Sequence, residues 1–307
     1  MRSTALHLET VLANALPLES LEVGLLGSVG CVLAQDVTIV EGDTEHVLIA
    51  KGTAIGARHI ALLAGENLGQ IWVHPKPRVV IVTVGSDLAD PGTPEDLHPD
   101  VNGIALTAAA TAAGAMTFRV GPLQSDPDLI RSTIEDQLVR ADVIITACGM
   151  NSGDYDMLTS VLRELGRVEI ARVNMTPGGA QGFGEIGPDS IPIFVLPGNP
   201  IASLLSFDIF VRPLLRRLMG HSKIHHRTIE ARLENTVEGA GDDARYIRAH
   251  TSRSGGVSTV RSVENSAEHP LAGLGTADSL IIVPANTSRV NAGETVKVLQ
   301  LESLGDE

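Results

Sequence analysis

The feature that most constrains the fold is the alternation of apolar strand-like segments with helical ones between Arg78 and about Gly220. RVVIVTV (78–84), DVIITAC (142–148) and IPIFVL (191–196) are continuous apolar runs, as expected for strands buried on both faces. Segments of helical character separate them, at 102–115, 126–141, 154–166 and 200–220. This alternation predicts a mostly parallel sheet between two helical layers, that is, a three-layer α/β domain.

The flanking regions have different patterns. The first region predicts a helix from Thr4 to Ala15, a β-like stretch over 30–40 and a helix over 57–63. The HPKP stretch (74–77) is stiff because each proline fixes its own φ, so a domain boundary is expected there. Short alternating segments after residue 228 predict an all-β domain.

The expected fold class is therefore α/β, with a short mixed N-terminal segment and a C-terminal all-β, barrel-like domain. The expected domains are 1–76, 77–221 and 222–307.

Composition excludes several functional classes. The chain has 307 residues, a net charge of −14 and only 3% aromatic residues, so nucleic-acid binding is not expected. Two cysteines, Cys31 and Cys148, cannot form a disulfide framework, which favours a reducing compartment. The first 23 residues lack the apolar centre of a signal peptide, and no apolar run reaches the length of a membrane span. We expect a cytoplasmic protein without a membrane partner.

Three turns follow predicted strands: VGSDL (84–88), ACGMNSGDYD (147–156) and LPGNP (196–200). Ligands of open α/β sheets bind beyond the carboxyl ends of the strands, where glycine lets them approach the backbone. A following helix offers free N–H groups to an anion. Any one of these turns can equally be an ordinary strand-to-helix connection, but three together indicate a binding cleft.

Acidic residues gather at the same predicted edge of the sheet. They are Asp87, Asp100, Asp126, Asp154 and Asp156. Carboxylates beside an anion-binding backbone suggest a hard cation such as Mg²⁺. The alternative for Asp126 and Asp154 is that they cap helices, and we favour it for Asp154. Asp87 and Asp156 are the stronger functional candidates.

Other features point away from catalysis. Residues 79–118 and the MTPGGA segment (175–180) contain no Lys or Arg, so an anion there must rely on backbone amides and metal. Cys148 is expected to be a buried thiol rather than a nucleophile. His225 and His226 are adjacent, so their side chains diverge and a metal site there is disfavoured.

These turns, in this order, resemble the MoeA-type molybdopterin molybdenumtransferase family, which includes the gephyrin E domain. The matching stretches are KPRVVIVTVGSDL, DVN (100–102), SDP (125–127), ACGMNSGDYD, TPGGA (176–180) and LPGNPIAS. The similarity also covers VLANALPLESLEVGLLGSVGCVLAQDV near the start and SLIIVPANTSRVNAGETVKVL near the end. It therefore extends over nearly the whole chain.

The resemblance implies a molybdopterin-binding α/β domain that inserts molybdate into adenylylated molybdopterin, with Mg²⁺ as cofactor and a homodimer as the assembly. It assigns catalytic roles to Asp87, Asp126 and Asp156, and metal binding to Asp87 and Asp156. The residues that it implies for the cofactor-binding cleft are Gly85, Ser86, Asn102, Gly149, Ser152, Gly153, Pro177, Gly178, Pro197, Gly198, Asn199 and Pro200.

Several family features are absent. The family continues after the position of Val40 into a DNSAMDGYA motif and a small β-rich domain, whereas VEGDTEHVLIAKG (40–52) crosses that interval directly. Thr176 and Gly179 stand where the family's KPGKP motif has lysines, and Ser86 replaces an acid. Two hypotheses follow: an enzyme of molybdenum-cofactor assembly that has lost one domain, or a non-catalytic pterin-binding or scaffold relative.

Overall fold

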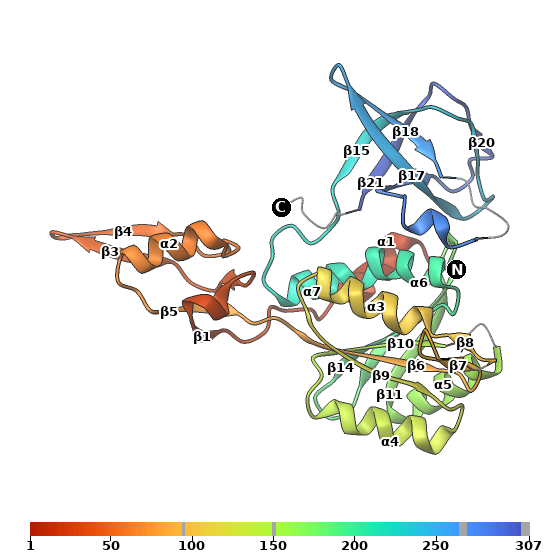
Figure 1. Ribbon diagram of the computed structural model, residues 1–307, viewed down its shortest axis with the longest axis horizontal. Coiled ribbons are helices and arrows are strands. Elements are labelled where there is room, and N and C mark those ends of the chain that lie inside the picture. Colours follow the sequence, from red (N-terminus) through yellow and green to blue (C-terminus); the bar gives the residue numbers. More distant parts are fainter. Residues whose placement is uncertain (94–95, 149–151, 264–268, 302–307) are drawn as a thin grey trace.

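The computed structural model describes residues 1–93, 96–148, 152–263 and 269–301. Its central feature is a six-stranded sheet, shown with its helices in Figure 1. The strand order is β11 (Gly166–Arg172), β13 (Ala180–Ile186), β14 (Ile191–Leu196), β10 (Val143–Cys148), β6 (Arg78–Val84) and β9 (Met116–Leu123). The last four strands are parallel, and β13 runs antiparallel to both of its neighbours.

Side chains that alternate along the strands build two cores, one on each face of the sheet. Val79 and Ile81 of β6 face a core shared with α1, α3, α6 and α7, whereas Val80 and Val82 face α4 and α5. The bounds of these helices are Thr4–Leu12, Val101–Ala112, Pro200–Ser206 and Arg212–Leu218 on one face, and Pro127–Leu138 and Ser152–Leu165 on the other. The prediction of three layers is thus confirmed (Figure 1).

The predicted long helix over 200–220 is interrupted. Between α6 and α7 lies η2 (Phe207–Val211), a π-helical turn. Pro213 has no N–H to donate to the carbonyl four residues earlier. The series of α-helical hydrogen bonds is therefore interrupted at this residue. The sequence reading also missed β13, because AQGFGEI carries glycines at positions where a strand pattern needs apolar residues.

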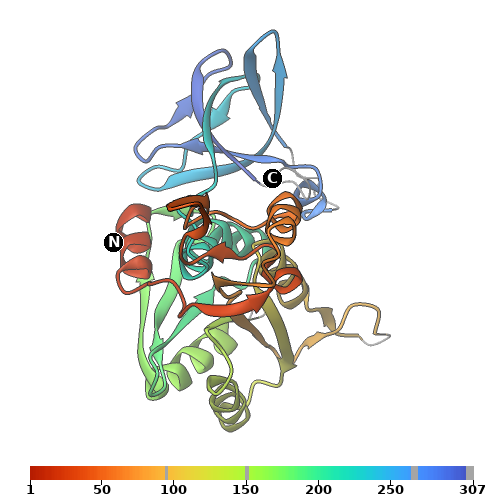
Figure 2. The same cartoon turned by 90° about the vertical axis from the view of Figure 1, so that its left-hand side faces the viewer.

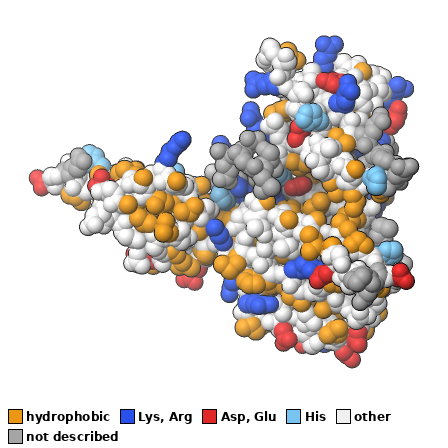
Figure 3. All heavy atoms as spheres, viewed as in Figure 1, with side chains coloured by type: hydrophobic (Ala, Val, Ile, Leu, Met, Phe, Trp, Pro, Cys, Tyr) orange, Lys and Arg blue, Asp and Glu red, His pale blue; other side chains and the backbone are white. Residues whose placement is uncertain are grey.

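The segment 21–74, which we call the arm, projects from the rest of the molecule (Figure 1). It holds a sheet of β1 (Leu21–Gly24), β5 (Gln70–His74) and β2 (Val32–Leu33), the helix α2 (Ala57–Gly65) and the hairpin β3 (Val37–Glu41)–β4 (Thr44–Ile49). The hairpin occupies the interval where the resemblance places a further domain. Hydrophobic side chains gather on the arm surface in Figure 3; exposed ones in this segment include Leu26 and Trp72.

The C-terminal region forms a second sheet, above the first in Figure 2. Its order is β12 (Met175–Thr176), β17 (Ala244–Ser254), β18 (Val257–Ser262), β15 (Thr228–Leu233), β21 (Thr295–Gln300) and β19 (Ser279–Val283). The additional pairing of β17 with β19 closes it around an aliphatic core, which confirms the barrel-like prediction. The short strand β12 comes from the α/β region and therefore links the two units.

Among the described residues, no helix has both the length and the apolar character that crossing a bilayer requires.

His7 of α1 is a buried titratable group that connects this helix to η2. The side chain is 1% exposed, and its ring meets Phe210 edge-on with 4.7 Å between centroids. Burial and the nearby Arg2 guanidinium lower the pKa of His7 from 6.5 to about 4.

We predict that His7→Phe removes part of the acid sensitivity of folding. Between pH 6.5 and pH 4 the unfolded chain is protonated at His7 and the folded chain is not. The free energy of unfolding therefore falls as the pH drops through this window. From pH 7 to pH 5 this loss is about 2 kcal/mol in the wild type and should vanish in the variant. Urea unfolding at both pH values measures it. The exposed His46→Gln is the control and should keep the wild-type slope.

Candidate functional site

One amide side chain joins the strand-end turns. Asn102 in the first turn of α3 is 6% exposed, and its Nδ2 donates to the Cys148 carbonyl at 3.3 Å and the Gly198 carbonyl at 2.7 Å. Cys148 ends β10, and Gly198 lies in the turn after β14, the adjacent parallel strand. Two of the three predicted turns, 147–156 and 196–200, are therefore joined through Asn102 at Cys148 and Gly198.

A cavity of about 510 Å³ lies at this edge of the sheet, and we call it the strand-end cavity. Five predicted site residues line it: Asp87, Asn102, Gly198, Asn199 and Pro200. Two of its lining oxygens, Asp87 Oδ1 and Asn102 Oδ1, are buried and have no hydrogen-bond partner in the described structure. Buried acceptors are normally satisfied, so this pair is suited to a cation or to a ligand that donates hydrogen bonds.

A larger cavity of about 910 Å³, the interdomain cleft, separates the α/β region from the barrel. Predicted residues Pro177, Gly178, Pro197 and Asn199 line one wall. The opposite wall includes Arg245 and Arg248 of β17, which the sequence reading did not consider. Burial lowers the pKa of Arg248, and the Arg245 guanidinium donates to the Glu238 carbonyl at 2.8 Å. The cleft thus contains cations that the nearby sequence lacks.

The LPGNP turn borders both cavities, because Asn199 and Ile201 line each of them. Asn199 caps α6: its Oδ1 accepts from the N–H groups of Ile201 and Ala202 at 3.0 and 3.2 Å. Pro200 occupies the first turn of that helix, as predicted. The turn is therefore held rigidly between the two cavities.

The TPGGA segment is attached to the barrel. Thr176 Oγ1 donates to Asp243 at 3.0 Å, and the Arg172 guanidinium donates to the same carboxylate oxygen at 2.6 Å. A Cβ placed on Gly179 would overlap Arg172 Nη1. The guanidinium therefore occupies the space that a side chain at 179 would need.

The three predicted catalytic aspartates are placed differently. Asp87 lines the strand-end cavity, whereas Asp126 is exposed and caps α4, accepting from the N–H groups of Asp128 and Leu129. Asp156 is exposed on α5 and is not among the described lining residues of either cavity. Asp87 is therefore the one of the three that this geometry brings to a cavity.

Asp154, expected to be a simple helix-terminal residue, is 5% exposed and accepts from Ser125 Oγ at 2.5 Å. Ser125 in turn exchanges hydrogen bonds with Ser86: each backbone N–H donates to the hydroxyl of the other residue, at 2.9 and 3.3 Å. Ser86 thus connects the turn after β6 with the SDP segment and α5. The preceding residue Gly85 is buried, and its N–H donates to the Leu123 carbonyl.

The other residues that the sequence analysis considered lie in α5, at the end of β10 and in the segment before β15. Ser152 begins α5 and Gly153 is exposed within it, while Gly149 lies outside the described residues. Cys148 is 1% exposed, and burial together with Asp154 raises its pKa to about 12, as expected of a buried thiol. His225 is exposed, whereas His226 is buried against Asp208 with Nε2 and Oδ1 3.0 Å apart, so the two side chains diverge.

Sequence reasoning missed Arg245 and Arg248 because β17 is distant in sequence from the turns of the α/β region. It missed Arg172 although this residue closely precedes the TPGGA segment, because no local pattern shows that the guanidinium covers Gly179. A usable signal was present for β17: ARYIRAH places two arginines in an alternating strand of an otherwise acidic chain. Which cavity they face depends on the pairing of β12 with β17, and local sequence does not specify that pairing.

Comparisons with known proteins agree with this architecture. Residues 80–217 match the family described as a probable molybdopterin binding domain, and residues 230–301 match the MoeA C-terminal region, domain IV. Molybdopterin molybdenumtransferase 1 of Mycobacterium tuberculosis is 36% identical over 268 residues, which make up 84% of this chain and 62% of that protein. The molybdopterin molybdenumtransferase of Bacillus subtilis is 28% identical over 266 residues, 85% of this chain and 61% of that protein.

Among solved structures, a molybdopterin biosynthesis MoeA protein from Pyrococcus horikoshii superimposes with a TM-score of 0.83 at 19% identity. The match covers 98% of this chain and 99% of that chain, and it shows a shared fold. The chain spans only about three fifths of the length of the curated relatives, between 61% and 62% for the two named above.

We predict that Gly179→Lys destabilises the protein because its side chain displaces the Arg172 guanidinium from Asp243. The expected loss is up to about 1 kcal/mol, because the displaced group is the end of a flexible, half-exposed side chain whose ion pair lies at the surface. Combining Gly179→Lys with Arg172→Ala should recover at least half of that loss, which a double-mutant cycle of urea unfolding measures. Additive losses would show that the two side chains do not compete for one space.

Proposed function

Since this chain belongs to the MoeA-type molybdopterin molybdenumtransferase family, we propose that it acts in molybdenum-cofactor biosynthesis by inserting molybdate into adenylylated molybdopterin. The observation that carries this proposal is the meeting of two cavities at one rigid turn, 196–200. The ligand is proposed to extend from one cavity to the other past this turn.

The strand-end cavity is the proposed pterin and phosphate region. Its walls include backbone at the carboxyl ends of parallel strands, where ligands of open α/β sheets bind. The residues proposed to shape the cofactor-binding cleft are Gly85, Ser86, Asn102, Gly149, Ser152, Gly153, Pro177, Gly178, Pro197, Gly198, Asn199 and Pro200. Asp87, Asp126 and Asp156 are the proposed catalytic acids, with Asp87 best supported by its position.

The interdomain cleft is the proposed site of the molybdate anion. A guanidinium binds oxyanions through several fixed donors, and it does so more strongly where water is excluded. Arg248 is 9% exposed, and burial lowers its pKa, so it already sits in a weakly hydrated environment. Arg245 and Arg248 therefore offer the positive charge that the TPGGA segment lacks.

Mg²⁺ fits one part of the site. The ion prefers oxygen ligands and is commonly held by one or two carboxylates together with water and phosphate. The unpartnered Asp87 Oδ1, with Asn102 Oδ1 in the same cavity, matches that donor set. Asp87 would hold the ion, and the ion would neutralise phosphate charge. Asp156, the other ligand predicted from the sequence, is not among the described residues that line this cavity. Among the residues that the structure describes, no group of three or more His, Cys, Asp or Glu forms a protein-only metal cage.

We further propose a cytoplasmic homodimer. The alternative, a non-catalytic molybdopterin-binding or scaffold protein, rests on the missing KPGKP lysines and the missing small domain. The presence of Arg245 and Arg248 in the cleft weakens that alternative.

Complementation tests the proposed activity. Expression of the chain in a bacterial strain without the transferase should restore nitrate reductase activity at physiological molybdate. Arg248→Ala should lower the restored activity about 100-fold, the usual effect of removing a charge-stabilising donor. Arg253→Ala, an exposed arginine farther along β17, should leave it unchanged.

No rescue by a folded wild-type chain would contradict the catalytic proposal. Calorimetry with adenylylated molybdopterin then separates the alternatives, because a binder gives a saturable isotherm and a scaffold gives none.

Asp87→Asn tests the metal role. Removing the carboxylate should raise the Mg²⁺ concentration needed for half-maximal ligand binding about tenfold, within the range seen when metal contacts are lost. Asp96→Asn, which changes an exposed acid of the same loop, should not alter it. Equal Mg²⁺ dependence in the wild type and Asp87→Asn would rule out Asp87 as a ligand.

A further inference from the structure

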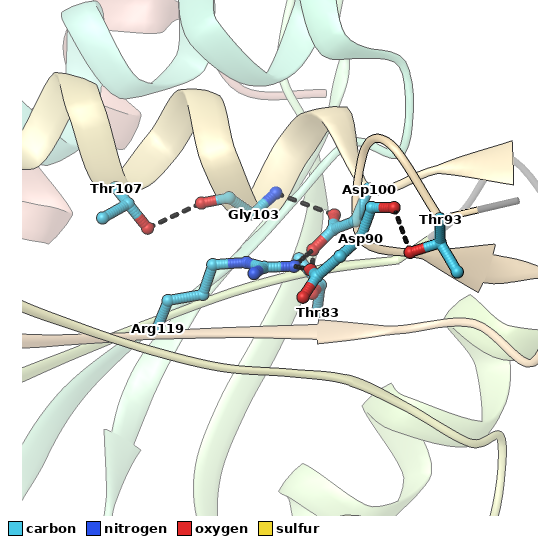
Figure 4. Close-up of polar contacts among 7 residues, drawn as sticks. All are labelled: Thr83, Asp90, Thr93, Asp100, Gly103, Thr107 and Arg119. Carbon is cyan, nitrogen blue, oxygen red and sulfur yellow. Dashed lines mark hydrogen bonds and ion pairs between the residues drawn. The ribbon is translucent and has the colours of Figure 1, made fainter.

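Arg119 of β9 forms an ion pair with Asp100, a lining residue of the strand-end cavity. Its Nη2 donates to Asp90 Oδ1 at 2.6 Å and to Asp100 Oδ2 at 2.7 Å, so one guanidinium nitrogen bridges two carboxylates (Figure 4). Burial opposes the charged guanidinium, but these two carboxylates outweigh it and raise the pKa of Arg119.

Asp100 is the buried end of this bridge. Its side chain is fully buried and accepts from Thr83 Oγ1 at 2.7 Å and from the Gly103 N–H at 2.8 Å, in addition to Arg119. The bond to Gly103 caps α3, and the same first turn of that helix carries Asn102. Asp100 therefore sets where α3 begins, and with it the position of the amide that joins Cys148 and Gly198.

Asp90 is the exposed end, with 62% of its side chain accessible. It belongs to the loop that follows β6 and carries Asp87 and His98, two lining residues of the cavity. Backbone bonds from the His98 N–H to the Asp87 carbonyl and from the Asp100 N–H to the Ala89 carbonyl, both 2.8 Å, fold this loop back on itself. The loop thus forms one wall of the cavity and α3 forms another.

We propose that Arg119 is a positioning residue, which holds these two walls at the separation that lets Asp87 and Asn102 contact one ligand. The inference rests on the proposed function for the identity of that ligand. Arg119 acts through Asp90 and through Asp100, which lines the cavity, and not on the ligand itself.

The site is built for arginine. A Cβ on Gly103 would overlap Asp100 Oδ2 and lie 2.7 Å from Arg119 Nε, so the absence of a side chain at 103 is what admits the guanidinium. A lysine ammonium is a compact point charge on a flexible chain and reaches a fixed pair of carboxylates less well than a planar guanidinium. Removing the charge altogether leaves Asp100 buried without its cation.

The test compares two arginine–aspartate pairs of the same sheet. Arg78 of β6 pairs with Asp142 at 2.8 Å, at the strand end opposite the cavity, so Arg78→Gln is the matched control. Arg119→Gln and Arg119→Lys change the bridge, and Asp90→Asn removes only its exposed arm while the buried pair stays intact. The probe is adenylylated molybdopterin with Mg²⁺, followed by calorimetry.

The dissociation constant should rise about 10–100-fold in Arg119→Gln, as for other residues that orient binding groups, and about threefold in Asp90→Asn. Arg119→Lys should recover part of the loss, and Arg78→Gln should stay within about twofold of the wild type. Hydrogen exchange without ligand is the second readout: the His98 and Asp100 amides should exchange about tenfold faster in Arg119→Gln and Asp90→Asn, but not in Arg78→Gln.

Equal affinities in the Arg119 and Arg78 variants, or unchanged exchange of both amides in Asp90→Asn, would overturn the inference. A wild-type protein that does not bind the probe would instead overturn the proposed function. The exchange experiment would still decide whether Arg119 holds the loop.

Discussion

The arrangement of the site depends on the two hydrogen bonds that the buried Asn102 amide donates to the carbonyls of Cys148 and Gly198. Turns at the ends of neighbouring parallel strands lie close together, but nothing in the strand ladder determines how far apart they stand. One amide that donates to two backbone carbonyls determines that separation. Asp100 holds Asn102 by capping α3, and Arg119 holds Asp100 (Figure 4). Removing any one of these contacts should displace the residues that line the cavity. Interior groups are close-packed, so no empty space absorbs the displacement.

The positive charges of the candidate site come from a distant part of the chain. The α/β turns contribute aspartates, amides and glycines, while the guanidinium groups of the interdomain cleft come from β17 of the barrel. The short pairing of β12 with β17, together with Asp243 bound by both Thr176 and Arg172, attaches one unit to the other. The Arg172 guanidinium also fills the space above Gly179. The barrel is therefore part of the candidate site as well as of the fold.

Sequence patterns predicted much of this. Continuous apolar runs at 78–84, 143–148 and 191–196 became central parallel strands, because burial on both faces demands such composition. Pro200 was correctly placed at a helix start. β13 was missed because glycine carries no strand signal. The predicted helix over 200–220 is helical from Pro200 to Leu218, but it contains a π-helical turn just before Pro213. The burial of Asp154 against Ser125 could not be predicted, since the pair is separated in sequence and joined by packing.

By itself the sequence determined the order of strands and helices, the three turns and the acidic residues beside them, because hydrophobic period and turn chemistry are local properties. The tertiary structure alone decided which of these residues share a cavity. It brought Asp87 and Asn102 together as unpartnered oxygens, left Asp126 as an exposed helix cap, and supplied Arg245 and Arg248 from a distant strand. The reason is physical: strand pairing and domain docking set long-range distances, and no local pattern of residues encodes them.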